Sequence, residues 1–140
     1  MTASLPSGAS QSRVLFADDE ESLRTLVSRI LGRLGYEVVA VKDGAQALTA
    51  YREAPRDWDL VLLDIVMPVM SGVIAYEGIR THDPDTRVLF CSGYHAESIE
   101  HLLKSDARLQ FLPKPFDIPS LEGALASLGL SSARRGDDAS

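Results

Sequence analysis

A short apolar run that ends on a carboxylate constrains this chain more than any other feature. The run covers residues 60–63, Leu-Val-Leu-Leu, and Asp64 follows it directly. It is too short for a helix and does not alternate with polar residues, which is typical of a central parallel strand buried on both faces. Pro68 and Gly72 then mark a turn before the next element. Asp64 is therefore expected at the carboxyl end of a buried strand, where open α/β sheets bind ligands.

Segments with strand character alternate with helical segments along the whole chain. Strands are predicted at 13–17, 36–41, 60–64, 87–93 and 109–112. Helices, whose apolar residues recur three and four apart (Leu26 and Ile74 among them), are predicted at 21–34, 43–54, 72–81, 96–104 and 118–128. This alternation predicts an α/β fold, a doubly wound five-stranded parallel sheet with five helices on both faces. The common strand order 2-1-3-4-5 would place the ends of the first and third strands side by side.

Length and charge narrow the class of protein further. The 140 residues suffice for one domain with a real core, and the net charge of −6 argues against a nucleic-acid partner. The one basic cluster, Arg134-Arg135, is followed by Asp137 and Asp138. Cys91 is the only cysteine, which rules out an intramolecular disulfide and is compatible with a reducing cytosol. No run resembles a signal peptide or a membrane span, so we expect a cytoplasmic protein without membrane insertion.

The domain is expected to cover residues 13–129, with flexible segments at 1–12 and 130–140. Both ends are rich in small and polar residues and lack a periodic apolar pattern. The chain shows no internal repeat and no second domain.

Four of the five predicted strands end in polar or charged residues. Asp18 and Asp19 follow the first, Asp64 ends the third, Ser92 the fourth, and Lys114 follows the fifth. Carboxylates that share a site raise one another's pKa, and a divalent cation relieves that repulsion. Because all the ligands on offer are oxygens, Mg²⁺ is the expected ion, with Mn²⁺ as the alternative.

The other polar residues at the strand ends suit a phosphoryl group. Lys114 supplies a cation for a phosphate oxygen, and Ser92 supplies a hydroxyl donor. Asp64 is then the natural nucleophile, which would attack phosphorus to give an aspartyl phosphate.

Four motifs in this order resemble the receiver domain of two-component response regulators. They are Val-Leu-Phe-Ala-Asp-Asp-Glu at 14–20, Leu-Leu-Asp-Ile-Val-Met-Pro-Val-Met-Ser-Gly at 62–72, Cys-Ser-Gly-Tyr at 91–94 and Phe-Leu-Pro-Lys-Pro-Phe at 111–116. The resemblance extends over about residues 13–128 and implies a flavodoxin-like (βα)5 fold. It also implies a module that is phosphorylated by a histidine kinase or a histidine phosphotransfer protein, and that is no enzyme beyond its own phosphorylation and dephosphorylation.

The resemblance assigns a role to each candidate residue. Asp64 is implied as the phosphoacceptor, with Lys114 and Ser92 binding the phosphoryl oxygens. Asp18, Asp19, Asp64 and the backbone carbonyl of Val66 are implied as the metal site, Asp18 acting through a metal-bound water. Ser92 and Phe111 are implied as the conformational switch, and a cis peptide is implied between Lys114 and Pro115.

Some positions depart mildly from the family pattern, and these bear on the lifetime of the phosphoaspartate. Ser92 replaces a more frequent Thr, and Phe111 lacks the hydroxyl of a more frequent Tyr. Val66 and Tyr94 occupy the two positions that tune dephosphorylation in the family. An output partner is expected on the face formed by helix 96–104, strand 109–112 and helix 118–128, and the domain is expected to be a monomer or a weak dimer. It would stand alone or belong to a hybrid histidine kinase.

Plainer interpretations stand beside these roles. Asp18 with Glu21 imitates a capping box, and Phe111 could be an ordinary core aromatic. Cys91 is expected to be a buried strand residue beside the site, and Trp58 is expected to report metal or phosphate binding by fluorescence.

Two other functions compete with the receiver. A Mg²⁺-dependent phosphatase of the haloacid-dehalogenase type also forms an aspartyl phosphate, but it needs a second Asp where this chain has Val66, and it needs an inserted cap. A flavin-binding module is disfavoured because residues 18–20 are acids where a phosphate-binding loop should be neutral.

Overall fold

The computed structural model describes residues 12–55, 57–93 and 99–130, and within them the strands form one parallel sheet. The strands are β1 (Arg13–Ala17), β2 (Glu37–Val41), β3 (Leu60–Asp64), β4 (Val88–Ser92) and β5 (Leu109–Pro113). Their order is β2-β1-β3-β4-β5, which confirms the predicted topology. All residues of β3 and β4 are buried, as the unbroken apolar runs predicted for central strands.

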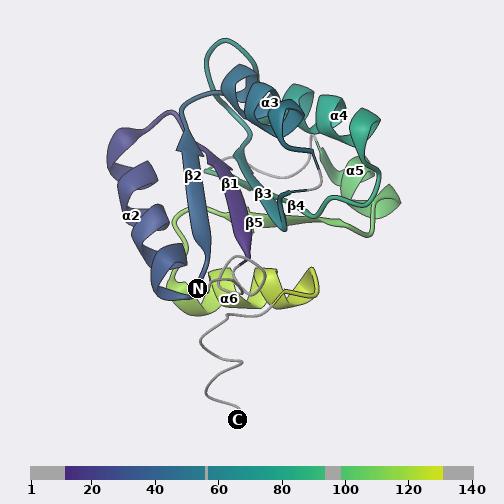
Figure 1. Ribbon diagram of the computed structural model, residues 1–140. Coiled ribbons are helices and arrows are strands. Elements are labelled where there is room, and N and C mark those ends of the chain that lie inside the picture. The colour runs from purple at the N-terminus through teal and green to yellow at the C-terminus, as the bar shows by residue number, and fades with distance from the viewer. Residues whose placement is uncertain (1–11, 56, 94–98, 131–140) are drawn as a thin grey trace, which may run out of the picture.

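Helices cover both faces of this sheet, as Figure 1 shows. They are α2 (Glu21–Arg33), α3 (Gly44–Glu53), α4 (Gly72–His82), α5 (Glu100–Ser105) and α6 (Ile118–Ser127). α3, α4 and α5 lie on one side, and α2 and α6 on the other. Successive strand side chains point to opposite faces, so each strand contributes to both cores. Leu63 and Phe90 face α3, α4 and α5, whereas Leu62 and Leu89 face α2 and α6.

The helices begin at the carboxyl edge of the sheet, where side chains cap three of them. Asp43 accepts a hydrogen bond from the backbone N–H of Gln46 at the start of α3 (2.8 Å), and Asp117 accepts one from Ser120 at the start of α6 (2.9 Å). Ser71 caps α4. The residue before α2, Glu20, makes no side-chain cap. Asp18 lies two residues before this N-cap position and accepts from the N–H of Glu20, not from that of Glu21, so Asp18 and Glu21 do not form a capping box.

Some residues lie away from the environments that the sequence pattern indicated. Leu26 on α2 is 54% exposed and Ile74 on α4 is 53% exposed, although both fit the apolar periodicity of their helices. Trp58 is buried just before β3, with the Arg13 guanidinium 4.4 Å from its ring centroid. It therefore lies at the amino edge of the sheet, roughly 20 Å of strand away from Asp64 at about 3.3 Å per residue. Trp58 lacks the proximity that a reporter of metal or phosphate needs.

Helix α5 is described from Glu100, preceded by the buried Ile99. The start predicted for it, residue 96, lies outside the described residues. Among the helices that are described, the longest has 13 residues, so none has the length and apolar character needed to cross a bilayer.

Candidate functional site

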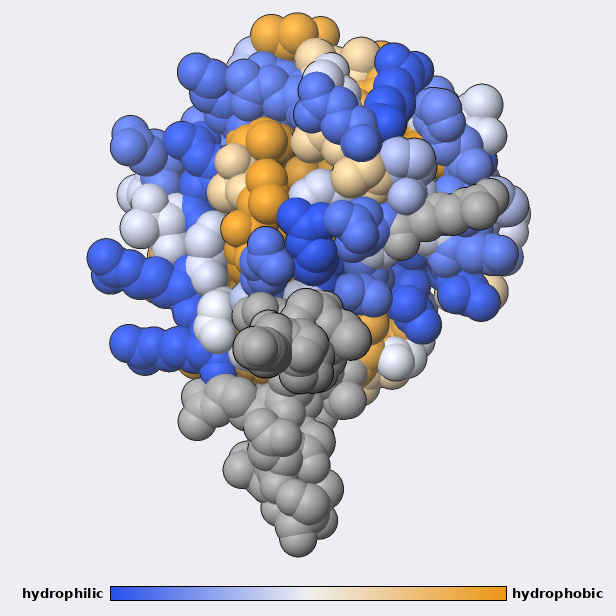
Figure 2. All heavy atoms as spheres, in the orientation of Figure 1, coloured by the Kyte–Doolittle hydropathy of each residue, from blue (hydrophilic) through white to orange (hydrophobic). Residues whose placement is uncertain are grey.

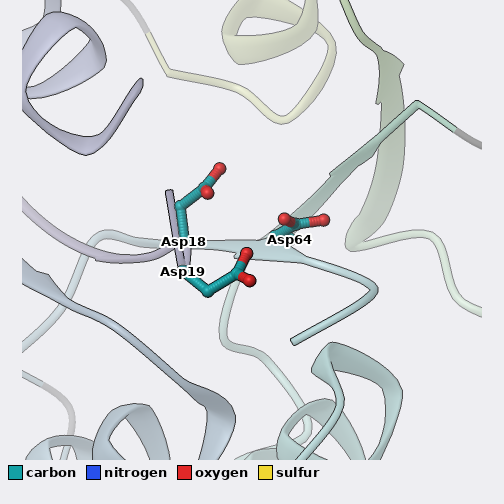
Figure 3. A group of neighbouring side chains, drawn as sticks. All are labelled: Asp18, Asp19 and Asp64. Atoms are coloured by element: carbon teal, nitrogen blue, oxygen red, sulfur yellow. The ribbon is translucent and has the colours of Figure 1, made fainter. Parts of the chain in front are cut away.

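Three carboxylates converge at the carboxyl ends of β1 and β3 (Figure 3). Asp18 and Asp19 follow β1 and Asp64 ends β3, and these strands are neighbours, with Ala17 paired to Leu63. One oxygen from each carboxylate lies within 4.8 Å of the others. Asp18 is fully buried, Asp64 is 6% exposed, and Asp19 faces solvent. The sheet order therefore brings together acids that are 45 or more positions apart in sequence, as predicted.

A lysine from the far edge of the sheet reaches into this cluster. The Lys114 ammonium lies 2.8 Å from Asp18 Oδ2 and 3.2 Å from Asp64 Oδ2. Lys114 follows β5, and its backbone N–H donates to the carbonyl of Ser92 at the end of β4 (2.9 Å). The peptide between Lys114 and Pro115 is cis, which confirms that prediction. One cation thus bridges the acids of β1 and β3.

Backbone and side-chain hydrogen bonds fix the orientation of the buried carboxylates. Asp18 Oδ1 accepts from the backbone N–H of Glu20 (2.9 Å), and Asp64 Oδ1 accepts from that of Val66 (3.3 Å). The Arg24 guanidinium donates to the backbone carbonyl of Asp18 (2.8 Å). Sequence reasoning missed Arg24, because its position on the predicted helix carries no signal of a contact six residues back.

Two glycines let the loop after β3 approach the site closely. A Cβ atom at Gly72 would collide with the carbonyl oxygen of Asp64, and one at Gly44 would collide with that of Met70. The Gly44 N–H donates to that same Met70 oxygen (3.0 Å), and the Gly72 N–H donates to Ile65 (2.9 Å). The loop is therefore fastened both to the end of β3 and to the start of α3.

The cluster is electrostatically unbalanced even with its lysine. Burial raises the pKa of Asp64 above its usual range; Lys114 opposes this shift and the Asp18 carboxylate adds to it. Burial alone would lower the pKa of Lys114, but its hydrogen bond to Asp18 and the neighbouring acids hold that pKa above the ordinary value. Lys114 therefore stays charged, but its single positive charge does not fully offset the negative charges of both Asp18 and Asp64.

The remaining predicted residues lie on β4 and β5, except Tyr94. Ser92 ends β4 and is buried, and Cys91 pairs with Asp64 across the sheet. Burial raises the pKa of the Cys91 thiol to about 12, which agrees with a structural role rather than a nucleophilic one. Phe111 is half-buried against the core beneath α3, α4 and α5. Tyr94 lies outside the described residues.

This arrangement offers a hard divalent cation a set of carboxylate oxygens and offers an anionic group a nearby ammonium. Mg²⁺ prefers oxygen ligands and commonly takes only one or two carboxylates, so the donor set of Asp18, Asp19 and Asp64 fits it. A phosphoryl group next to Asp64 would meet the Lys114 ammonium within the same site.

Comparison with known proteins identifies this arrangement. Residues 14–126 match the family described as the response regulator receiver domain. Over 108 residues the chain is 36% identical to the sensor kinase CckA of Brucella abortus, and over 106 residues it is 37% identical to the chemotaxis protein CheY of Bacillus subtilis. The matches cover 77% and 74% of this chain, 86% of CheY, and only 11% of the sensor kinase.

A solved structure agrees with this relationship. The response regulator TrrA of Thermotoga maritima, in complex with Mg²⁺-BeF, superposes with a TM-score of 0.74 at 29% identity, covering 84% of this chain and 99% of that one. None of these findings favours the haloacid-dehalogenase phosphatase alternative. The chain belongs to the response regulator receiver domain family of two-component signalling systems.

Proposed function

We propose that Asp64 accepts a phosphoryl group from a histidine kinase or a histidine phosphotransfer protein in a Mg²⁺-dependent reaction. The observation that carries this proposal is the placement of Asp64, nearly buried, between two further carboxylates and the Lys114 ammonium. A phosphoacceptor needs a fixed carboxylate oxygen, a cation for the transferred oxygens and a place for a metal ion, and these residues meet all three needs.

Each residue has a distinct part in the transfer. Asp64 directs one carboxylate oxygen at phosphorus while its other contacts keep the group from rotating. The P–N bond of the donor's phosphohistidine breaks as the P–O bond to Asp64 forms, and the electron pair returns to the imidazole. Lys114 and the Ser92 hydroxyl would bind the oxygens of the transferred group.

Asp19, Asp64 and the backbone carbonyl of Val66 would hold Mg²⁺, with Asp18 acting through a metal-bound water. When bound, this ion would neutralise charge on the equatorial oxygens of the phosphoryl group. The TrrA structure, which contains Mg²⁺-BeF, supports the same use of the acidic cluster here.

Phosphorylation would also drive a change of shape. A phosphoryl group adds a charge of about −1.5 to −2 beside a buried hydroxyl, that of Ser92. Ser92 would move towards the phosphate, and the half-buried Phe111 on neighbouring β5 would turn inward into the space released. The surface that changes is formed by α5, β5 and α6, where an output partner would bind.

The same family context supports a cytoplasmic location and a domain that covers 13–129. The relatives include a short protein, CheY, of which the match covers 86%, and a much longer sensor kinase, of which it covers 11%. The domain would therefore either stand alone or form part of a larger kinase.

Acetyl phosphate with Mg²⁺ tests the chemistry without a protein donor. We expect the chain to gain one phosphate, detected by intact-mass spectrometry and mapped to Asp64, and Asp64→Asn to gain none. Asp85→Asn, which changes an exposed acid between α4 and β4, is the matched control and should label as the wild type does. Equal labelling of Asp64→Asn and the wild type would refute the assignment.

A further inference from the structure

β2 is the outermost strand at one end of the sheet, and its outer side is open. The strand order begins with β2, so among the described residues no further strand pairs with it there. β2 is also the one strand of the described sheet without a buried residue, although its sequence is Glu-Val-Val-Ala-Val. Figure 2 shows an orange group left of centre, where Figure 1 places β2 between α2 and α3. β2 therefore presents an exposed apolar strand at the surface.

The hydrogen bonds to β1 determine which backbone groups of β2 face outward. The Glu37 N–H donates to the carbonyl of Ser12, just before β1 (2.8 Å), so Glu37 and every second residue after it face β1. The backbone groups of successive strand residues point to opposite sides, so those of Val38 and Ala40 face outward. The described residues offer no partner to the N–H and C=O groups of Val38 and Ala40.

The usual protection of an outer strand is missing in the middle of β2. Native proteins block such strands with a proline, a bulge or a charged side chain. Residues 38–41 contain neither proline nor charge, and β2 pairs with β1 in continuous register, without a bulge. Charged residues stand only at the two ends, Glu37 and Lys42. An outer strand of this kind can take up an added strand from a partner through backbone hydrogen bonds.

Two shallow hollows beside β2 indicate which side chains an added strand should carry. The hollow on the α2 side, of about 390 Å³, is lined by Ala40 and by basic and hydroxyl residues, namely Arg24, Thr25, Ser28 and Arg29. The hollow on the α3 side, of about 340 Å³, is lined by one acid and otherwise by uncharged residues: Val41, Ala45, Gln46, Thr49, Ala50 and Glu53. Alternate side chains of an added strand would lie in opposite hollows. Acidic side chains suit the first hollow, and small apolar ones suit the second.

The charge of the α2 side favours an acidic partner over a second copy of this chain. Arg29 is exposed and makes no ion pair within the described part of the chain, and Arg24 donates to the backbone carbonyl of Asp18 rather than to a carboxylate. In a symmetric antiparallel pairing of two β2 strands, both α2 helices would lie on the same face of the joined sheet. The arginines of the two copies would then approach one another, which is unfavourable.

We propose that the outer side of β2 binds an extended segment of a partner protein by strand addition, and that this segment carries acidic residues at alternate positions with small apolar residues between them. β2 and β5 lie at opposite ends of the strand order, so this surface is separate from the output face proposed above. Its use does not require phosphorylation of Asp64, and the test is therefore made without a phosphodonor.

The probe is a capped heptapeptide, Thr-Glu-Val-Glu-Val-Glu-Thr, titrated into the isotope-labelled full chain and followed by NMR. One control peptide groups the same residues as Glu-Glu-Glu-Thr-Thr-Val-Val, and another carries Lys in place of Glu. Two further forms are N-methylated, at the Glu or at the Val residues, because only alternate N–H groups of an added strand face β2. Ala40→Pro removes an outward N–H without removing a bond to β1, and Ala40→Ser is the matched control that keeps this N–H.

We expect the alternating peptide to bind with a dissociation constant of about 1 mM or less, and to shift the amide signals of Val38 and Ala40 most. Ala40→Pro and Arg29→Glu should each weaken binding about tenfold, whereas Ala40→Ser should bind within about twofold of the wild type. The grouped and Lys peptides should also bind about tenfold more weakly, and the two N-methylated forms should differ from each other by a similar factor.

Equal binding of the alternating and grouped peptides would overturn the proposal, because charge alone would then account for binding. The absence of a saturable shift with the alternating peptide, or equal affinities of the two N-methylated forms, would overturn it as well. Dimerisation of the chain that Ala40→Pro abolishes would show that a second copy occupies β2 instead. If Ala40→Pro does not unfold cooperatively in urea, the N-methylated peptides and Arg29→Glu decide the question.

Discussion

The two edges of the sheet use similar polar residues for opposite purposes. At the amino edge, Asp106 accepts hydrogen bonds from the Tyr76 hydroxyl and from Arg80 Nε (2.9 Å), and Arg80 also donates to the carbonyl of Thr86 (2.7 Å). At the carboxyl edge, three acids lie together and one lysine, Lys114, contacts two of them, Asp18 and Asp64. Opposite charges are matched and closed in the first network, whereas like charges crowd in the second.

The pKa shifts of Asp106 and Asp64 reflect this difference between the two edges. Burial alone would raise the pKa of Asp106, but the Tyr76, Arg108 and Arg80 hydrogen bonds outweigh it and hold that pKa below its usual range. The pKa of Asp64 is shifted upward, mainly by burial. A network that lowers the pKa of its acid stabilises the fold, and one that raises it stores a cost that a ligand can relieve. The amino edge is built for stability and the carboxyl edge for binding.

The largest effect should follow from breaking the amino-edge network. Asp106→Asn removes the charge that pairs with Arg80, and both side chains are mostly buried, at 14% and 16% exposure. Leaving Arg80 unpaired should lower the free energy of unfolding by about 3 kcal/mol, measured by urea denaturation. Labelling of Asp64 by acetyl phosphate should remain at the wild-type rate in the folded protein. A loss of labelling without a loss of stability would contradict the division between the edges.

Binding of Mg²⁺ at the carboxyl edge should raise the free energy of unfolding, by less than Asp106→Asn lowers it. At a Mg²⁺ concentration ten times its dissociation constant, the wild type should gain about 1.4 kcal/mol in unfolding free energy, because the ion binds only the folded site. Asp19→Asn should lose most of this gain. Asp57→Asn, which removes an exposed partner of Arg13 at the amino edge, is the control and should keep it.

Neutralising the phosphoacceptor should stabilise the metal-free protein. Because the folded-state pKa of Asp64 is raised, its ionisation opposes folding at pH values above that pKa, and the cost disappears once pH falls below the unfolded-state pKa of about 3.9. In EDTA, Asp64→Asn should therefore be more stable than the wild type at pH 7, and this difference in unfolding free energy, measured by urea denaturation, should become small below about pH 4.

The contribution of Asp106 to the free energy of unfolding should depend on pH in the opposite way to that of Asp64. Its lowered pKa contributes stability above the unfolded-state pKa, and that stability is lost as pH falls through the folded-state value. The gap between wild type and Asp106→Asn should thus narrow in the acid range. Parallel pH curves for the two variants would contradict the comparison.

The smallest effect concerns Trp58, which belongs to the amino edge. Addition of Mg²⁺ should leave its fluorescence nearly unchanged, since it lies at the far end of β3 from Asp64. A tryptophan placed beside the site, in the double variant Trp58→Phe, Val66→Trp, should respond to the ion. A strong response of Trp58 would show that the two edges are coupled.

The sequence predicts the carboxyl edge far better than the amino edge. The strand order and the convergence of Asp18, Asp19, Asp64 and Lys114 follow from short motifs, because each motif ends a strand and parallel strands end together. The network around Asp106 joins residues 26 and 30 positions apart through side chains that any surface helix could carry. Periodicity does not specify such partners.

The loop conformation at Val69 was missed for a similar reason. The motif indicates a turn through Pro68 and Gly72, but a valine gives no signal of positive φ, which only the tertiary bonds to Gly44 and Gly72 impose. The exposure of Leu26 was missed because apolar spacing shows which residues share a helix face and not how far that face extends beyond its neighbour.

The position at which α6 ends determines how this domain can be joined to other domains. Arg87, immediately before β4, donates from Nε to the carbonyl of Leu128 (2.7 Å), so α6 ends beside the start of the sheet, where β1 also begins. A domain fused before Arg13 or after Leu130 would therefore be attached at the amino edge of the sheet. Attachment at either end leaves the carboxyl edge, with its acidic site, accessible to a partner. The same domain can thus occur in proteins of different domain order without a change in its site.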